Sequence, residues 1–209
     1  MKTQTKITQE SLTPQLARQI LIDGNERFVQ NVKAPRNLQN QVKETSQGQF
    51  PFAVILSCID SRVPVELVFD QGIGDVFSAR VAGNVVNEDV LGSMEYACKV
   101  AGSKIVVVMG HTKCGAVTAA CKSVELGNIT TLLNKIQPAV NIVKAASENT
   151  QQEMSDASIE EVTKLNIELS INRIRKESSI LAEMEQLGEI EIVGALYSVA
   201  TGKTTFFEG

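Results

Sequence analysis

Residues 104–115 read KIVVVMGHTKCG, an apolar run that passes abruptly into polar residues. Short runs rich in valine and isoleucine are typical of β-strands that are buried on both faces. Residues 52–62, FAVILSCIDSR, repeat this pattern with a second apolar run and a second polar ending. Such strands, in alternation with helical segments, predict an α/β fold with a mainly parallel central β-sheet flanked by helices.

The remaining segments extend this pattern over a single α/β domain spanning residues 1–209. Residues 1–50 are expected to form an N-terminal helical arm, with a helix in 12–31 and a polar linker in 32–49. The other expected helices are a short one begun by Pro64, one over about 88–100, one starting near Cys114, and a mostly helical region 132–185 interrupted by a polar loop at 147–158. The other expected strands are 75–81, 189–199 and an edge piece in 203–209.

Composition and charge exclude several classes of function. The 209 residues carry a formal net charge of −4 and show no basic cluster, which argues against binding to nucleic acid or to an anionic membrane. No apolar run approaches the roughly 20 residues that a membrane span requires. The opening residues, MKTQTKITQESL, lack the apolar core of a secretory signal, so we expect a cytoplasmic protein.

The cysteines and the single histidine are the candidate chemical groups. None of the four cysteines forms a CxxC pair, and disulfides are not expected in a chain without a signal segment. Cys98 and Cys121 are each expected to be small buried residues without a chemical role. Cys58 and His111 instead end the two most apolar strands, and Cys114 follows His111 by three positions.

These three residues are predicted to meet at one edge of the sheet. Ligands of open α/β sheets bind beyond the carboxyl ends of the strands. Cys114 is expected at a helix start, where the partial positive charge of the helix favours a thiolate. Two thiolates and one imidazole suit zinc, and three protein ligands leave the fourth position open, as in catalytic rather than structural zinc sites.

Asp60 and Arg62 allow two interpretations. In the first, Asp60 or Ser61 caps the short helix after Pro64 and Arg62 is solvated. In the second, Asp60 lies close to the metal and Arg62 holds it in a paired, ionised state. The spacing alone leaves both interpretations open.

Taken together, the motifs Cys58-Ile-Asp60-Ser61-Arg62 and His111-Thr-Lys-Cys114-Gly115 resemble the signature of the β-class carbonic anhydrases. The 53 positions between Cys58 and His111 are also similar to that family, and the resemblance runs from about Leu16 to the segment EIEIVGALYSVATG. It implies that Cys58, His111 and Cys114 bind zinc and that Asp60 and Arg62 form the catalytic pair beside it. It further implies a homodimer or homotetramer, with the N-terminal helix reaching across to a partner.

The resemblance also implies a substrate pocket. Gln49, Phe77 and Tyr96 match the positions that line the carbon dioxide pocket in many members. Members with an inhibitory bicarbonate pocket carry tryptophan three positions before the first cysteine. Ile55 stands there in this chain, which argues against that form of regulation.

The expected reaction is reversible hydration of carbon dioxide to bicarbonate and a proton by a zinc-bound hydroxide. Two thiolates cancel the charge of zinc, so we expect activity to rise through the alkaline range. With its one histidine used as a ligand, the chain is expected to depend on buffer for proton transfer. The alternatives are a hydrolase of carbonyl sulfide or carbon disulfide on the same scaffold, a non-catalytic zinc-stabilised protein, and a redox or nucleophilic Cys/His enzyme.

Overall fold

The computed structural model describes residues 2–146 and 153–208 and contains one five-stranded sheet. Its strands are β1 (Ala53–Ser57), β2 (Val76–Arg80), β3 (Ile105–His111), β4 (Glu191–Tyr197) and β5 (Thr204–Phe207). The order across the sheet is β2-β1-β3-β4-β5; the first four are parallel, and β5 runs antiparallel to β4. The predicted mainly parallel α/β fold is therefore confirmed, and the segment expected as an edge piece forms the edge strand β5.

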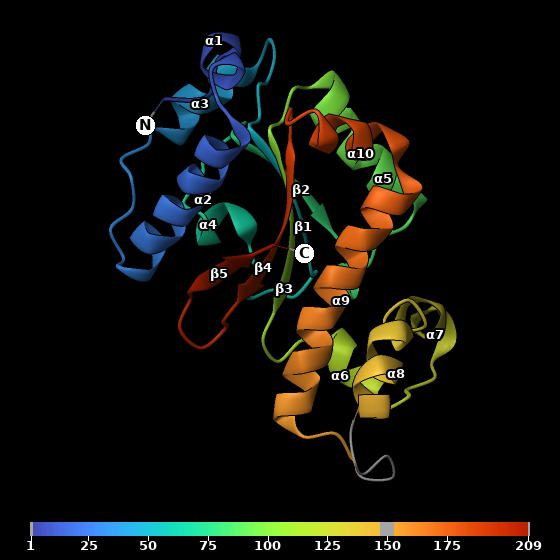
Figure 1. Cartoon of the computed structure of the whole chain (residues 1–209). Helices are drawn as coiled ribbons and strands as arrows, with labels where there is room; N and C mark the ends of the chain where they lie inside the picture. The colour runs from blue at the N-terminus through green and yellow to red at the C-terminus, as the bar shows by residue number, and fades with distance from the viewer. Residues whose placement is uncertain (1, 147–152, 209) are drawn as a thin grey trace.

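Helices cover both faces of this sheet (Figure 1). One side carries α1 (Lys6–Glu10), α2 (Pro14–Val29), α3 (Leu38–Thr45) and α4 (Val65–Val68). The other side carries α5 (Glu88–Glu95) with its continuation η2 (Tyr96–Val100), α9 (Asp156–Glu177) and α10 (Ser179–Gln186). The helices α6 (Gly115–Cys121), α7 (Gly127–Leu133) and α8 (Gln137–Ala146) lie beyond the carboxyl end of β3, and the short turn η1 (Ala82–Asn84) follows β2.

The apolar runs form strands because both of their faces find a hydrophobic partner. Alternate side chains of a strand point to opposite faces. Val54, Leu56 and Val106 accordingly pack with the apolar side of α9 and α10, whereas Ile55 and Val107 pack with α2 and α4. All residues of β1 and β3 are buried. A third cluster, between α6, α8 and α9, closes the core beside the carboxyl ends of the strands.

Three sequence predictions need correction or limitation. The expected linker 32–49 contains α3, which begins after Asn37, where the Asn37 side chain accepts a hydrogen bond from the Asn40 amide. The helix expected over about 88–100 widens into a π-helical turn from Tyr96. Of the predicted loop 147–158, residues 147–152 lie outside the described residues, and α9 already begins at Asp156. Within 2–146 and 153–208, no helix is long and apolar enough to span a bilayer.

Asp70, just after α4, ties the N-terminal arm to the domain. Arg27 Nε donates to its carboxylate at 2.6 Å, and Arg36 and the Ala34 amide also donate to it. Burial alone would raise the pKa of Asp70, but these three donors outweigh burial and lower it. The carboxylate therefore stabilises the fold above its unfolded pKa of about 3.9, and this contribution is lost as the pH falls through the lower folded pKa.

We expect Asp70→Asn to lower the free energy of unfolding at pH 7 by about 3 kcal/mol, because it removes the buried carboxylate charge that faces Arg27 and Arg36. The difference from the unchanged protein should start to shrink as the pH falls below about 4, where Asp70 of the unfolded chain becomes protonated, and shrink further as the pH approaches the lower folded pKa. Urea denaturation at pH 7 and at pH 3 measures both values. A difference of equal size at both pH values would show that the Asp70 charge contributes nothing.

Candidate metal centre

Strand order brings the two half-sites together. β1 and β3 are parallel neighbours in the sheet, so Cys58 and His111 emerge at the same edge. Cys114 follows a tight turn in which Lys113 has a φ of 55°, and it stands directly before α6. The donor atoms of Cys58, His111 and Cys114 all lie within 4.8 Å of one another, and all three residues are buried. The predicted ligand cluster is therefore present.

The geometry of this cluster fits a tetrahedral zinc ion. Two sulfur atoms bound to one zinc at about 2.3 Å would lie roughly 3.8 Å apart, and the Sγ atoms of Cys58 and Cys114 are 4.0 Å apart. His111 Nδ1 lies 3.0 Å from the Thr112 carbonyl oxygen, so it carries the proton and donates it there. His111 Nε2 is then the atom with a free lone pair, and it is buried without a hydrogen-bond partner among the described residues.

The two buried sulfurs share one hydrogen bond, in which Cys114 Sγ donates to Cys58 Sγ. The hydrogen bond that Cys114 Sγ donates lowers the pKa of Cys58; burial opposes this effect, and the Gly83 amide, 3.3 Å from Cys58 Sγ, reinforces it. Hydrogen bonding to Cys58 and burial both raise the pKa of Cys114. Without a cation, Cys58 therefore favours the thiolate and Cys114 keeps its proton. A divalent cation would displace that proton and bind both sulfurs as thiolates.

Asp60 and Arg62 form the pair that the second interpretation predicts. Arg62 Nε lies 2.9 Å from Asp60 Oδ1, and Arg62 Nη2 lies 2.7 Å from Asp60 Oδ2. These bonds lower the pKa of Asp60 to about 2, against an opposing effect of burial. Asp60 Oδ2 also lies 3.9 Å from His111 Nε2, beside the ligand cluster. The helix-cap interpretation is wrong, since α4 begins after Pro64 and receives no side-chain cap within the described chain.

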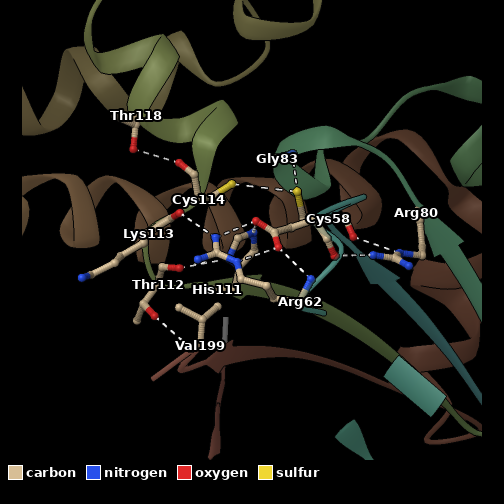
Figure 2. A network of polar contacts seen from close by, with 11 residues as sticks. Cys58, Arg62, Arg80, Gly83, His111, Thr112, Lys113, Cys114, Thr118 and Val199 are labelled. Carbon is tan, nitrogen blue, oxygen red and sulfur yellow. Dashed lines mark hydrogen bonds and ion pairs between the residues drawn. The ribbon is translucent and has the colours of Figure 1, made fainter. Parts of the chain in front are cut away.

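Backbone contacts hold the two half-sites in place, as Figure 2 shows. Arg80, at the end of β2, donates from Nε to the Cys58 carbonyl at 3.0 Å and from Nη2 to the Asp60 carbonyl at 2.7 Å. Arg62 Nη2 reaches the Lys113 carbonyl at 3.3 Å and so joins the loop after β1 to the loop after β3. The two arginine side chains thus hold the loops after β1 and β3 by hydrogen bonds to their main-chain carbonyl oxygens.

Three contributors were missed in the sequence. Arg80 could have been found, because it is a polar residue at the carboxyl end of a third strand, where the same rule applies. The Gly83 amide carries no side-chain signal at all. Tyr197 lies opposite His111 in the register of β3 and β4, and burial raises the pKa of its hydroxyl. Its place next to the site depends on strand pairing, which a single sequence does not reveal.

The predicted pocket residues lie apart from the ligand cluster within one chain. Phe77 and Tyr96 contact each other edge to face, with ring centroids 6.2 Å apart, and line a hollow beside β2 and α5. Phe77 pairs with Val54, four residues before Cys58, which at roughly 3.3 Å per residue is about 13 Å back along the strand. Gln49 is exposed in the segment before β1.

The other two cysteines match the expectation for buried residues. Cys98 lies in the core between α9 and the sheet, where burial raises the pKa of its thiol to about 12. Cys121 lies near the end of α6, and burial likewise raises its thiol pKa. Both thiols therefore stay protonated near neutral pH.

Comparison with known proteins agrees with this site. The family model described as carbonic anhydrase matches residues 53–204, which include all three candidate ligands. Carbonic anhydrase 2 of Mycobacterium tuberculosis is 33% identical over 196 residues, 91% of each chain, and the carbonic anhydrase of Mycolicibacterium smegmatis is 32% identical over 197 residues, also 91% of each. The crystal structure of the β-carbonic anhydrase CafA of Aspergillus fumigatus superposes with a TM-score of 0.72 at 27% identity, over 81% of both chains. On this evidence of sequence, fold and site, the chain belongs to the β-carbonic anhydrase family.

Proposed function

We propose that this carbonic anhydrase hydrates carbon dioxide reversibly to bicarbonate and a proton, with zinc held by Cys58, His111 and Cys114. The observation that carries the proposal is the buried cluster of three donor atoms within 4.8 Å, with the Asp60–Arg62 pair beside it. Three ligands leave one tetrahedral position for the reaction. When bound, zinc supplies a hydroxide nucleophile near neutral pH by lowering the pKa of water.

Asp60 is placed to orient the nucleophile. It stays ionised through the neutral range because Arg62 lowers its pKa to about 2, so it can accept a hydrogen bond but cannot deliver a proton. Both of its oxygens are held by Arg62. Arg62 would therefore hold Asp60 beside the ligand cluster and keep its carboxylate from turning onto a bound metal.

Proton removal then has to rely on groups from outside the site. The only histidine of the chain is a proposed ligand, and Asp60 has too low a pKa to carry protons near neutrality. We expect the kcat for hydration to rise with buffer concentration at saturating carbon dioxide and to level off at high buffer. Stopped-flow assays at constant ionic strength measure this dependence. A kcat that is independent of buffer would mean that the protein contains its own proton relay.

The substrate pocket and the assembly are proposed together. Gln49, Phe77 and Tyr96 are proposed to line the carbon dioxide pocket, and within one chain Phe77 and Tyr96 lie away from the ligands. A second copy could supply these residues to the site, and Tyr96 is half exposed, as such an interface requires. A homodimer or homotetramer is therefore proposed; one fold neighbour, from Sordaria macrospora, is described as a tetrameric β-carbonic anhydrase.

The experiment that tests the function compares substrates on zinc-quantified protein. We expect rapid turnover of carbon dioxide and much slower turnover of carbonyl sulfide and carbon disulfide. Faster turnover of a sulfur-containing substrate would assign the site to that hydrolase reaction instead. Bound zinc without turnover of any of the three would assign it a non-catalytic role.

A further inference from the structure

A buried asparagine on α9 contacts the turn that reaches Cys58. Asn166 Nδ2 donates a hydrogen bond to the Gly83 carbonyl oxygen at 3.0 Å, and only 3% of Asn166 is exposed. The Gly83 amide in turn lies 3.3 Å from Cys58 Sγ and donates to it. Two consecutive hydrogen bonds therefore connect α9 with a proposed zinc ligand, although Asn166 follows Cys58 by more than a hundred positions in the sequence.

The turn that carries Gly83 has an unusual backbone that requires outside support. Gly83 has a φ of 68° and Asn84 a φ of 45°, so two successive residues adopt the left-handed conformation. For a residue other than glycine this conformation is strained and persists only where the surroundings hold it. Arg173, two turns after Asn166 on α9, donates to the Val86 carbonyl at 2.7 Å and holds the far end of the same loop.

Asn166 is one of three polar residues on the buried face of α9, with Thr163 and Ser170. The other buried side chains of this helix that face the core are mainly apolar, among them Val162, Ile167, Ile171 and Ile174. Burial of an amide costs free energy unless its polar atoms are paired. The bond to the Gly83 carbonyl pairs the Asn166 amide group and holds the Gly83–Asn84 peptide. That peptide is joined at the Gly83 Cα to the peptide whose N–H donates to Cys58 Sγ, so its position helps to set the φ of Gly83 that directs this N–H.

We propose that Asn166 is a positioning residue of the metal centre, which aims the Gly83 amide at Cys58 Sγ. This inference rests on the proposed function, because Cys58 must be a zinc ligand. An amide that donates to a thiolate stabilises its negative charge and fixes the direction of its remaining lone pairs. Without Asn166, the Gly83–Asn84 peptide keeps only the bond from the Asn84 amide to the Val81 carbonyl, and we expect the Gly83 N–H to turn away from Cys58 Sγ.

The first test is zinc affinity, measured by competition with a chromophoric chelator. We expect Asn166→Leu, which keeps the size of the side chain, to bind zinc about 10-fold to 100-fold more weakly, the usual effect of removing a partner of a metal ligand. Ser170→Ala is the matched control, because Ser170 lies one turn later on α9 and lines the same hollow as Asn166. An equal affinity for Asn166→Leu and the unchanged protein would overturn the proposal, as would an equal loss in Ser170→Ala.

A second measurement separates positioning from a general loosening of the fold. In protein loaded with cadmium-113, the Gly83 amide proton should show a scalar coupling to the metal through its hydrogen bond to Cys58. We expect this coupling to persist in Ser170→Ala and to vanish in Asn166→Asp, a variant of the same size that removes the amide donor. Persistence of the coupling in Asn166→Asp would overturn the proposal, and so would its absence from the unchanged protein.

These outcomes are distinct from failure of the proposed function. If the unchanged protein itself bound no zinc, or bound it without hydrating carbon dioxide, the function would be wrong at its first step. If the unchanged protein bound zinc and was active, equal results for Asn166→Leu would refute the role of Asn166 alone.

Discussion

Replacing Cys58 with serine is expected to remove bound zinc and to lower kcat/KM for carbon dioxide hydration at least ~1,000-fold. This loss is larger than the loss expected when a residue that only hydrogen-bonds a ligand is replaced. Cys58 provides one of only three buried donor atoms in the cluster. A serine hydroxyl stays protonated near neutral pH and offers a much poorer ligand than a thiolate. Metal analysis after gel filtration and stopped-flow assays measure the two effects.

Cys121→Ser is the matched control for this change. Cys121 is also a buried cysteine near the carboxyl end of the sheet, but it stands outside the ligand cluster. We expect this variant to keep its zinc and its activity, with some loss of stability from burying a hydroxyl group. A Cys58→Ser protein that retained zinc and full turnover would show that the metal is held elsewhere.

The second large effect is expected at Arg62. Arg62→Ala should lower kcat/KM about 100-fold while zinc remains bound, a loss of the size seen when one preorganised electrostatic partner is removed. Without the two side-chain bonds from Arg62, the Asp60 carboxylate keeps only the bond from the amide of residue 62 to Oδ1, and Oδ2 loses its Arg62 donor. Its Oδ2 atom already lies 3.9 Å from His111 Nε2, close enough to occupy the open metal position. Zinc analysis and hydration kinetics on the same sample test this.

Lys113→Ala serves as the control for charge. Lys113 is an exposed cation next to Cys114, and its side chain takes no part in holding Asp60. The variant removes a nearby positive charge but leaves the Arg62 bonds in place, so we expect activity within about 3-fold of the unchanged protein, as for a screened surface charge. Full turnover in Arg62→Ala would refute the role of Arg62, and an equal loss in Lys113→Ala would reduce it to a general effect of charge.

Much of the fold and the centre of the site could be predicted because strong local signals coincide there. The runs ending in Cys58 and His111 are too apolar for any exposed strand, and their polar endings mark the edge where parallel strands place ligands. Asp60 and Arg62 are two positions apart, so their pairing depends on local geometry alone. The choice between pair and helix cap needed the structure, in which α4 has no side-chain cap and Arg62 bonds both oxygens of Asp60.

The other features depend on contacts between distant parts of the chain. The segment expected as a linker forms α3, where buried Gln41 accepts a hydrogen bond from the Ile73 amide far along the chain. Gly83 contributes a main-chain N–H that donates to Cys58 Sγ. Every residue except proline has such a group, so the residue type does not predict this contact. In the sequence, Asn166 is an ordinary polar residue of a long helix. Only the packing of that helix against the sheet brings it into contact with Gly83.

The measurement that tests the central claim most directly is stopped-flow carbon dioxide hydration during titration of zinc into metal-free protein. Activity is expected to rise in proportion to bound zinc and to reach its maximum at one zinc per chain. Hydration by metal-free protein, or a fully loaded protein that does not hydrate carbon dioxide at any pH from 6 to 9, would contradict it.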